Sequence, residues 1–520
     1  MRYLVVVIAL VSTLRAQGGD GLLDATMKRF EGWRSHRDIV GVAEAERALH
    51  RLRGLIDAPD AVRERACAFL ETVVTSPAPQ PEVYRSRVAA VGLIGVLAVE
   101  RPWAEFLIKV ARGRRPELRG LDFWVERALG ELRGKTHAEH LASLLDDDND
   151  ALVRLALGGL ARMKRAAQRP VLLASLPRLL ERTRDDDPEL RSRAVLALSL
   201  VAGEGASVPA LFAAARDESP VVRLAAARAC ARLGRRPGVE PVIGRLLEDA
   251  IALVREEAVI AYRACGHRET AGTLIRRLDK EPLRVRIAIA ETLEVLTGER
   301  LPPEHGPWKR WLGAEEKPPG VGDGSYARPR YYDVPVESDR ILFILDVSMS
   351  MGYALHQNTK SISRLAGAKR ELVRVISALD DRSRFNIMTF STAIGTWRKT
   401  LQGATEKVRK SGAAHVRRLG HAGKTNSHGA LAEAFERFPD IDTIFFVTDG
   451  IPTVGKTTVQ EHIIERVAHW NRLRGVRIHT IAAMPAEPDP PVGQYTPNHD
   501  AIRFMRILAA ETGGTFTRVR

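Results

Sequence analysis

The sequence predicts a multidomain protein in which an all-α helical repeat array precedes an α/β domain with a doubly wound, mostly parallel sheet. Three observations predict this order. The chain has 520 residues, which is too long for one ordinary core. A short pattern recurs every 31 to 37 residues in the middle of the chain. From Arg340 onward, apolar strand-like runs alternate with amphipathic helical segments.

The first segment, Met1 to Ala16, has the features of an export signal. Arg2 supplies a positive start, and Tyr3 to Val11 is an apolar run too short to span a membrane. An uncleaved anchor and a buried first helix remain alternatives, because Leu14 and Arg15 make a poor cleavage site. No later segment is apolar enough to span a bilayer. We therefore expect an exported protein of the periplasm, the cell envelope or the extracellular space.

The composition disfavours a disulfide scaffold and a nucleic-acid-binding protein. Three cysteines, Cys67, Cys230 and Cys265, cannot form a closed set of disulfides, and each lies in a helical apolar pattern as a small hydrophobic residue. The net charge of +15 is carried largely by arginine. Acidic residues interleave with these arginines and no aromatic stacking stripe accompanies them, so we expect no nucleic-acid partner.

A repeated unit occupies the middle of the chain, where an acidic turn is followed by an aliphatic residue, an arginine and an alanine-rich helix. The aspartates of the pattern are Asp150, Asp187, Asp217, Asp249 and Asp279, and the arginines are Arg154, Arg191, Arg223, Arg255 and Arg286. Another amphipathic segment precedes each of these helices, so each unit is predicted to contain two short helices. In one second helix Val222, Ala226 and Ala229 share a face, which neighbouring repeats are expected to cover.

The spacing and pattern of these units resemble HEAT-type repeats of the short variety. In that family the recurring aspartate and arginine tie one repeat to the next, which the resemblance implies here as well. We expect a HEAT-like repeat domain over residues 17–312, with an irregular start before residue 140. Trp308 and Trp311 fall in its predicted closing segment.

The repeat region shows no pattern typical of an active site. His137, Glu139 and His140 lie close together, but a zinc protease needs two histidines one helical turn apart with a placed glutamate. We expect these three residues at the surface.

Residues 313–339 are rich in proline, glycine and charge, and are predicted to be a linker between domains. Within them, Tyr331-Tyr332 and Val334 to Val336 are candidates for an edge segment that docks against the next domain.

The region from 340 to 520 is predicted to alternate strands and helices. The expected strands are Ile341–Asp346, Phe385–Phe390, Gly395–Arg398, Thr443–Thr448, Val476–Ala482 and Thr515–Val519. The expected helices are Ile362–Leu379, Ala404–Val416, Ser427–Phe438, Val459–Arg474 and Ala501–Thr512. This order predicts a Rossmann-like, doubly wound sheet that binds ligands beyond the carboxyl ends of its strands.

Polar side chains follow the first of these strands at alternate positions. The apolar run from Ile341 to Leu345 stops at Asp346, and Ser348 and Ser350 follow. If the backbone stays extended, the three oxygens point the same way, as a hard divalent cation requires. The same residues are compatible with an aspartate that caps a following helix and two incidental serines. Both interpretations remain open from this stretch alone.

Two further pieces fall where metal ligands would be needed. Thr425 precedes a predicted helix, and Asp449 follows the apolar strand Ile444 to Val447. Because the carboxyl ends of parallel strands share one edge of the sheet, these residues and the Asp346 stretch are expected at that edge.

The three parts in this order resemble the von Willebrand factor type A (VWA) domain and its metal-ion-dependent adhesion site (MIDAS). By position, the resemblance implies that Ser348, Ser350 and Thr425 offer hydroxyls to the metal. It implies that Asp346 and Asp449 hold the metal's waters or coordinate it directly. Many members of the family have glycine where this chain has Met349, a departure that affects the local loop geometry.

The donor set suits Mg²⁺, with Mn²⁺ or Ca²⁺ as alternatives. Mg²⁺ prefers six oxygens, retains waters and needs only one or two carboxylates. Two acids and three hydroxyls leave one of the six coordination positions open, so a carboxylate from a protein partner can complete the shell. The motif holds no general base or nucleophile, and we therefore predict a binding, adhesion or scaffold protein, not an enzyme. Repeat arrays linked to such domains resemble envelope proteins of bacteria with large exported repertoires.

A second motif predicts a different function. Gly450 to Thr457 matches the phosphate-binding pattern G-x-x-x-x-G-K-[ST] between a strand and a helix, which is typical of an ATPase. However, Asp449 would place a negative charge beside the phosphates, and no apolar strand ending in an acid follows. Nucleotide binding at this loop is the alternative to the metal-dependent function. A scaffold in which the repeats are the main binder is a third possibility.

Overall fold

The computed structural model describes residues 20–35, 49, 51–76, 81–99, 101–112, 120–163, 166–201, 207–266, 268–313, 328–354, 362–484 and 497–519. The predicted export segment, residues 1–16, and residues 314–327 of the predicted linker lie outside this part. The chain divides into two compact units after Gly266. Among the described helices, none is both long and apolar enough to cross a membrane.

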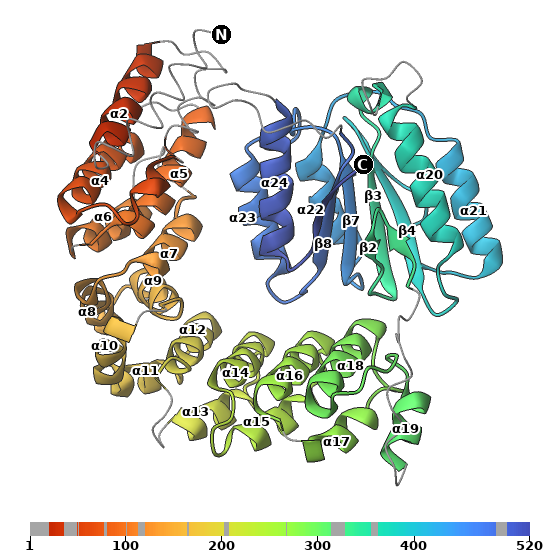
Figure 1. Ribbon diagram of the computed structural model, residues 1–520, viewed down its shortest axis with the longest axis horizontal. Coiled ribbons are helices and arrows are strands. Elements are labelled where there is room, and N and C mark those ends of the chain that lie inside the picture. Colours follow the sequence, from red (N-terminus) through yellow and green to blue (C-terminus); the bar gives the residue numbers. More distant parts are fainter. Residues whose placement is uncertain are drawn as a thin grey trace. The chain divides into compact units, whose positions relative to one another are not determined.

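The described part of the first unit is helical (Figure 1). Its α-helices are α2 (Asp20–Ser35), α4 (Asp60–Val74), α5 (Pro81–Leu97), α6 (Arg101–Ala111), α7 (Asp122–Glu131), α8 (Lys135–Ser143), α9 (Asp150–Leu160), α10 (Arg169–Ala174), α11 (Leu176–Arg182), α12 (Pro188–Leu198), α13 (Ser207–Ala214), α14 (Pro220–Leu233), α15 (Val239–Leu246) and α16 (Ala252–Cys265). The second helices of successive repeats, α9, α12, α14 and α16, each pack against the next. Val222, Ala226 and Ala229 are buried on α14, which confirms the shared inner face predicted for them.

The repeated aspartates and arginines join consecutive repeats. Arg191 binds both carboxylate oxygens of Asp217 at 2.9 Å. Arg223 in turn binds Asp249 through Nε and Nη2, with the Nη2 to Oδ1 distance at 3.2 Å. Arg154 reaches Asp187 of the following repeat at 3.1 Å. The ties that the family resemblance implied are therefore present.

Each aspartate of these pairs also fixes the turn before its own helix. Oδ1 of Asp217 accepts a hydrogen bond from the Ser219 N–H at 2.8 Å, and Asp249 does the same for the Ile251 N–H at 2.8 Å. One carboxylate thus orders a turn locally and neutralises an arginine from the preceding repeat. This double role explains why the aspartate of the pattern lies in a turn, where it binds both the backbone of its own repeat and the arginine in the second helix of the preceding repeat.

Two expectations about single residues of the first unit have different outcomes. The three cysteines are buried and free, as expected, and burial raises the pKa of each thiol. The surface position expected for His137 is wrong, because its side chain is fully buried on α8. Burial lowers the pKa of this imidazole to about 4, so it is neutral at physiological pH.

The second unit begins with α17 (Ala271–Ile275), α18 (Leu283–Thr297) and α19 (His305–Gly313) and continues into the α/β domain. A hairpin of β1 (Arg330–Tyr331) and β2 (Val334–Pro335) precedes the main sheet. Its two central residues, Tyr332 and Asp333, have positive φ values of 48° and 66°, as a two-residue hairpin turn requires. Tyr331 is fully buried against Phe343 and Phe445. The expected docking of this segment against the α/β domain is confirmed, but the hairpin forms a two-stranded sheet of its own and does not extend the edge of the main sheet.

The main sheet is mostly parallel, in the order β5-β4-β3-β7-β8-β9, with β6 paired to β4. Its strands are β3 (Arg340–Asp346), β4 (Arg384–Phe390), β5 (Ile394–Thr396), β6 (Gln402–Gly403), β7 (Thr443–Thr448), β8 (Arg477–Ala482) and β9 (Phe516–Arg518). The helices are α20 (Arg364–Ser377), α21 (Glu406–Arg417), α22 (Ser427–Arg437), α23 (Gln460–Asn471) and α24 (Pro497–Glu511). The predicted repeat-then-α/β fold class is therefore correct.

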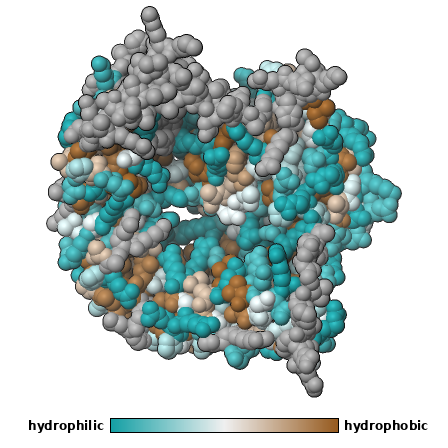
Figure 2. Space-filling view, viewed as in Figure 1, coloured by the Kyte–Doolittle hydropathy of each residue, from teal (hydrophilic) through white to brown (hydrophobic). Residues whose placement is uncertain are grey.

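Helices cover both faces of this sheet. Phe343, Phe385 and Phe445 face α20 and α21 in one buried layer, while α22, α23 and α24 lie on the other face (Figure 1). The outward side of α21 is hydrophilic in Figure 2, in agreement with the exposed Glu406 and Lys410. Burial of β3 and β7 on both faces explains their continuous apolar sequences.

The strand order reverses direction beside β3. The chain passes from β3 to β4 on one side and then returns to place β7 on the other side of β3. Crossovers that leave a strand toward opposite sides open a crevice at its carboxyl end. Asp346 ends β3 and Asp449 directly follows β7, so both lie at this switch point.

The amino ends of the same strands contact α18. The Leu283 N–H at the start of α18 donates to Asp339, directly before β3, at 3.2 Å. Arg284 donates to the carbonyl oxygens of Asp442 and Gly475, which precede β7 and β8. The helix α18 is therefore hydrogen-bonded to the amino ends of the strands, which lie opposite the switch point.

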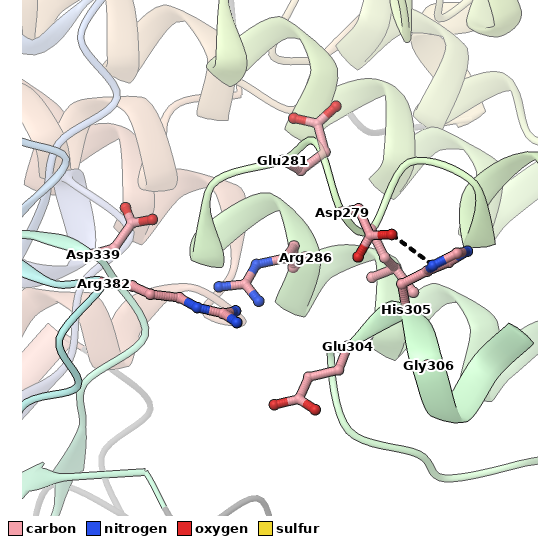
Figure 3. Close-up of a pocket in the computed structure, with 9 residues that line it drawn as sticks. Asp279, Glu281, Arg286, Glu304, His305, Gly306, Asp339 and Arg382 are labelled. Carbon is pink, nitrogen blue, oxygen red and sulfur yellow. Dashed lines mark ion pairs between the residues drawn. The ribbon is translucent and has the colours of Figure 1, made fainter.

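A polar cleft of about 470 Å³ lies beside this junction (Figure 3). Most of its carboxylates are already paired within the protein: Asp279 binds His305 at 2.6 Å, and Glu281 binds Arg277 at 2.8 Å. Asp339 is engaged with the start of α18. These pairings identify the cleft as part of the junction between α18, α19 and the sheet.

Asp442, at this junction, is expected to make the free energy of unfolding depend on pH. Desolvation raises the pKa of this half-buried carboxyl from 3.8 to about 6. A carboxyl with a raised folded-state pKa favours folding below its unfolded pKa and loses that contribution as pH rises through the folded value. We expect Asp442→Asn to be more stable than the wild type by about 1–3 kcal/mol above about pH 7 and equal to it near pH 4. Denaturant unfolding across this pH range measures the difference, with the exposed Asp440→Asn as the unchanged control. Equal pH slopes for wild type and Asp442→Asn would contradict the prediction.

Candidate metal centre

The candidate centre begins where β3 ends. Asp346 is fully buried, and its Oδ1 accepts a hydrogen bond from the Ser348 N–H at 2.8 Å. Its Oδ2 accepts a hydrogen bond from the Thr448 hydroxyl at 2.6 Å. The pairing of Leu345 with Val447 in the parallel ladder places Thr448 beside Asp346. Two neutral donors on different elements therefore fix the orientation of this carboxylate.

The two predicted serines connect Asp346 to the end of β7. Ser348 Oγ and Ser350 Oγ are 3.2 Å apart, and Ser350 Oγ donates to Asp449 Oδ1 at 2.8 Å. The short 3₁₀ helix from Met349 to Gly352 begins after Ser348 and turns Ser350 toward β7. Met349 takes no positive φ here, so the position does not need the glycine that is common in the family.

Thr425 lies in the loop before α22 and is bound to the loop after β7. Its carbonyl oxygen accepts hydrogen bonds from the Thr453 and Val454 N–H groups at 2.9 and 3.2 Å, and its own N–H donates to Thr453 Oγ1 at 2.9 Å. Its hydroxyl lies 4.0 Å from where a Cβ on Gly450 would be. Among the described residues the Thr425 hydroxyl has no hydrogen-bond partner, which leaves its oxygen available.

The structure thus brings four predicted residues, Asp346, Ser348, Ser350 and Asp449, into one connected network and places Thr425 beside Gly450. Asp346 and Asp449 are both buried. Burial, followed by the negative charge of Asp449, raises the pKa of Asp346 to about 7. Two carboxylates in one buried site repel each other, and a bound cation relieves that repulsion.

Sequence reasoning did not identify one residue of this site. Arg364, the first residue of α20, donates from Nη1 to Asp449 Oδ2 at 2.7 Å. Its backbone N–H donates to Tyr353 O at 2.9 Å, so the start of α20 lies beside the end of the 3₁₀ helix. Nothing in the local pattern of α20 distinguishes Arg364 from a solvated helix arginine, and only the fold reveals its partner.

The oxygens present fit a hard divalent cation. Carboxylates and hydroxyls are the ligand types that Mg²⁺ accepts, and two carboxylates are enough for it. No group of three His, Cys, Asp or Glu side chains suited to a metal occurs among the described residues. A softer ion such as Zn²⁺ lacks its preferred nitrogen and sulfur ligands here. A bound ion would supply a Lewis-acidic centre for an incoming carboxylate, with Asp346 and Asp449 to orient its waters.

The loop that matches the phosphate-binding pattern has a different geometry. A phosphate loop uses its free backbone N–H groups at a helix N-terminus. Here the Thr453 and Val454 N–H groups are engaged with Thr425, and α23 begins only at Gln460, after the exposed Lys456. The loop therefore serves to hold Thr425 in place, and its geometry does not support nucleotide binding.

Family models match both the helical repeat region and the α/β domain of this chain. The von Willebrand factor type A domain model matches residues 341–451, a span that contains all five predicted site residues. The HEAT repeat model matches residues 176–263. The chain therefore carries a VWA domain after HEAT-like repeats, as the sequence predicted.

Two curated relatives share part of this chain. The inter-alpha-trypsin inhibitor heavy chain H4 of Homo sapiens is 32% identical over 145 residues, which are 25% of this chain and 14% of that protein. The heavy chain 4 of Mus musculus is 26% identical over 149 residues, which are 26% of this chain and 15% of that protein. The match thus spans about a seventh of these relatives.

Solved structures with similar folds include a von Willebrand factor type A protein from Catenulispora acidiphila. It has 20% identity and a TM-score of 0.27, and covers 36% of this chain and 40% of that one. The PilB minor pilin from Streptococcus sanguinis has 15% identity and a TM-score of 0.27, and covers 36% of this chain and 58% of that one.

The buried hydrogen bond from Thr448 to Asp346 generates a stability prediction. Thr448→Val keeps the shape of the side chain but removes a donor to a buried carboxylate. We expect a loss of about 1–3 kcal/mol in the free energy of unfolding, because the oxygen would remain desolvated without its partner. Thr448→Ser, which retains the hydroxyl, is the matched control and should lose less. Denaturant titration measures both, and equal losses would show that the hydroxyl has no such role.

Proposed function

We propose that this protein is a non-enzymatic binding protein whose VWA domain holds Mg²⁺ through Asp346, Ser348, Ser350, Thr425 and Asp449. The ion then binds an acidic side chain of a protein partner. The observation that carries the proposal is the hydrogen-bonded network from Asp346 through the two serines to Asp449 at the switch point of the sheet. Three separate segments converge there on an oxygen-rich, buried site.

The surroundings of the site support a protein partner. Met349 lies between the two serines, Tyr353 follows the 3₁₀ helix, and Ile362 lies two residues before Arg364. All three are exposed large hydrophobic residues. Apolar side chains exposed around a polar centre are typical of an interaction surface. Small hydrophilic ligands would gain little from them.

The charge of the same edge supports an acidic ligand. Lys424, next to Thr425, and Lys456, in the loop after β7, are exposed. Positive side chains around a cation site favour a carboxylate and disfavour a basic partner.

The proposed function includes export of the protein to the periplasm, cell envelope or extracellular space. Its support is the positively charged and apolar segment formed by Arg2 and residues 3–11. We expect expression in a bacterium to yield secreted or envelope-associated protein, and deletion of residues 2–16 to leave it in the cytoplasm. Fractionation with immunoblotting measures this, and an unchanged distribution after the deletion would rule out the export role.

The central test is metal-dependent capture of a partner. We expect immobilised full-length protein to retain a partner from an envelope extract in Mg²⁺ or Mn²⁺ and to release it in EDTA. Asp346→Ala should reduce retention at least about tenfold, because the site loses a carboxylate that organises both β3 and β7.

Two controls accompany this capture experiment. Asp440→Asn changes an exposed acidic residue away from the site and should retain the partner as the wild type does. Circular dichroism should show that Asp346→Ala keeps the helical signal of the repeats. Retention that survives both EDTA and Asp346→Ala would exclude the metal-dependent function and favour the repeats as the binder.

A further inference from the structure

Arg364 is held inside the candidate metal centre by three separate constraints. Its Nη1 donates to Asp449 Oδ2 at 2.7 Å, its guanidinium lies 5.9 Å from the centre of the Tyr353 ring, and its side chain is only 13% exposed. The backbone pairing of Ala354 with Ser363 positions the start of α20. A long and otherwise flexible cation is thereby fixed against a carboxylate assigned to the metal.

This position is unfavourable for α20 itself. Arg364 is the first residue of a 14-residue helix, where the helix dipole disfavours positive charge. Its Nε is also buried and has no hydrogen-bond partner among the residues that the structure describes. Nothing within α20 compensates the unfavourable dipole interaction or the burial of Nε. The compensating interaction is therefore the contact with Asp449. A residue that violates a local preference in this way is expected where a site requires it.

The arginine changes the charge that a metal ion meets. Asp346 and Asp449 together carry two negative charges when ionised, and Arg364 reduces the net charge of the site to minus one. Asp449 has both oxygens engaged, one by Ser350 and one by Arg364. The site therefore attracts a divalent ion less strongly than two uncompensated carboxylates would. With the ion bound, the net charge of the site is more positive, which favours an incoming acidic group.

We propose that Arg364 is a specificity-determining residue of the metal centre, which weakens divalent-cation affinity by neutralising Asp449 and so leaves the bound ion selective for an acidic ligand. The inference rests on the proposed metal-dependent function. It assigns to Arg364 an electrostatic role and not only that of a structural tie between α20 and β7.

Isothermal titration of the full-length protein with MgCl₂ tests the inference without any partner. Arg364→Gln removes the charge but keeps a hydrogen-bond donor for Asp449, and we expect Mg²⁺ to bind about tenfold more tightly. Tenfold is the least change expected, because one unit charge a few ångströms from a divalent ion acts on it by about that factor in water and by more in a buried site. Arg364→Lys keeps the charge and should bind Mg²⁺ within about threefold of the wild type.

Thermal unfolding gives a second readout. Without metal, Arg364→Gln should melt below the wild type, and its gain in Tm on addition of Mg²⁺ should exceed that of the wild type. A purely structural tie predicts the same gain in Tm for both proteins. If Arg364→Gln fails to fold, Arg364→Lys alone decides, since a tenfold change in its Mg²⁺ affinity would refute a role based on charge.

The outcomes separate this inference from the proposed function. Equal or weaker Mg²⁺ binding by Arg364→Gln, with binding by the wild type intact, overturns the role of Arg364 and leaves the metal centre standing. Absence of Mg²⁺ binding by wild type, Arg364→Gln and Arg364→Lys alike overturns both. Tighter binding by Arg364→Gln together with wild-type binding by Arg364→Lys supports the inference.

Discussion

The burial of a carboxylate at the end of the central strand is the constraint on which the rest of the α/β domain depends. Asp346 can lie in the interior only because the Ser348 N–H and the Thr448 hydroxyl satisfy its two oxygens. The first donor fixes the turn after β3, and the second requires β7 to pair with β3 in its observed register. The positions of both serines and of Asp449 follow from these two bonds.

Aspartate–arginine pairs occur in both parts of the chain with different consequences. Between repeats, Asp217 orders its own turn and binds Arg191, so the pair closes on itself and leaves no oxygen free for a ligand. At the candidate metal centre, Asp449 binds Arg364 and Ser350, beside the second carboxylate of Asp346, whose hydrogen-bond donors among the described residues are neutral. Both pairs join a carboxylate to a guanidinium. The neighbouring groups determine whether such a pair only stabilises the fold or also forms part of a candidate binding site.

Sequence periodicity was sufficient for the α/β fold and for placing Asp346 and Asp449 at one end of the sheet, because the carboxyl ends of parallel strands necessarily meet. The roles expected for Ser348, Ser350 and Thr425 came from the resemblance to the VWA family. Asp346 and Asp449 are far apart in sequence, yet each terminates a buried apolar run and could be assigned to one edge. Arg364 could not be found in this way, since its contact with Asp449 depends on where the start of α20 lies relative to the carboxyl ends of β3 and β7. His137 was misplaced because a single polar residue in a mixed helix gives no sign of the side it faces. The phosphate-loop pattern stayed an alternative in the sequence, because its glycines and hydroxyls also suit a loop that is hydrogen-bonded to Thr425.

The attachment of α18 at the amino ends of the strands has a mechanical consequence. A partner pulling on the metal centre would apply tension at the carboxyl ends of β3 and β7, while Arg284 and Asp339 anchor α18 at the opposite ends of the same strands. The tension is then parallel to the strands. The hydrogen bonds between β3 and β7 therefore bear the load at the same time and do not break one after another. A domain arranged in this way can transmit a pull from its ligand to the terminal repeat helix without first opening its own sheet.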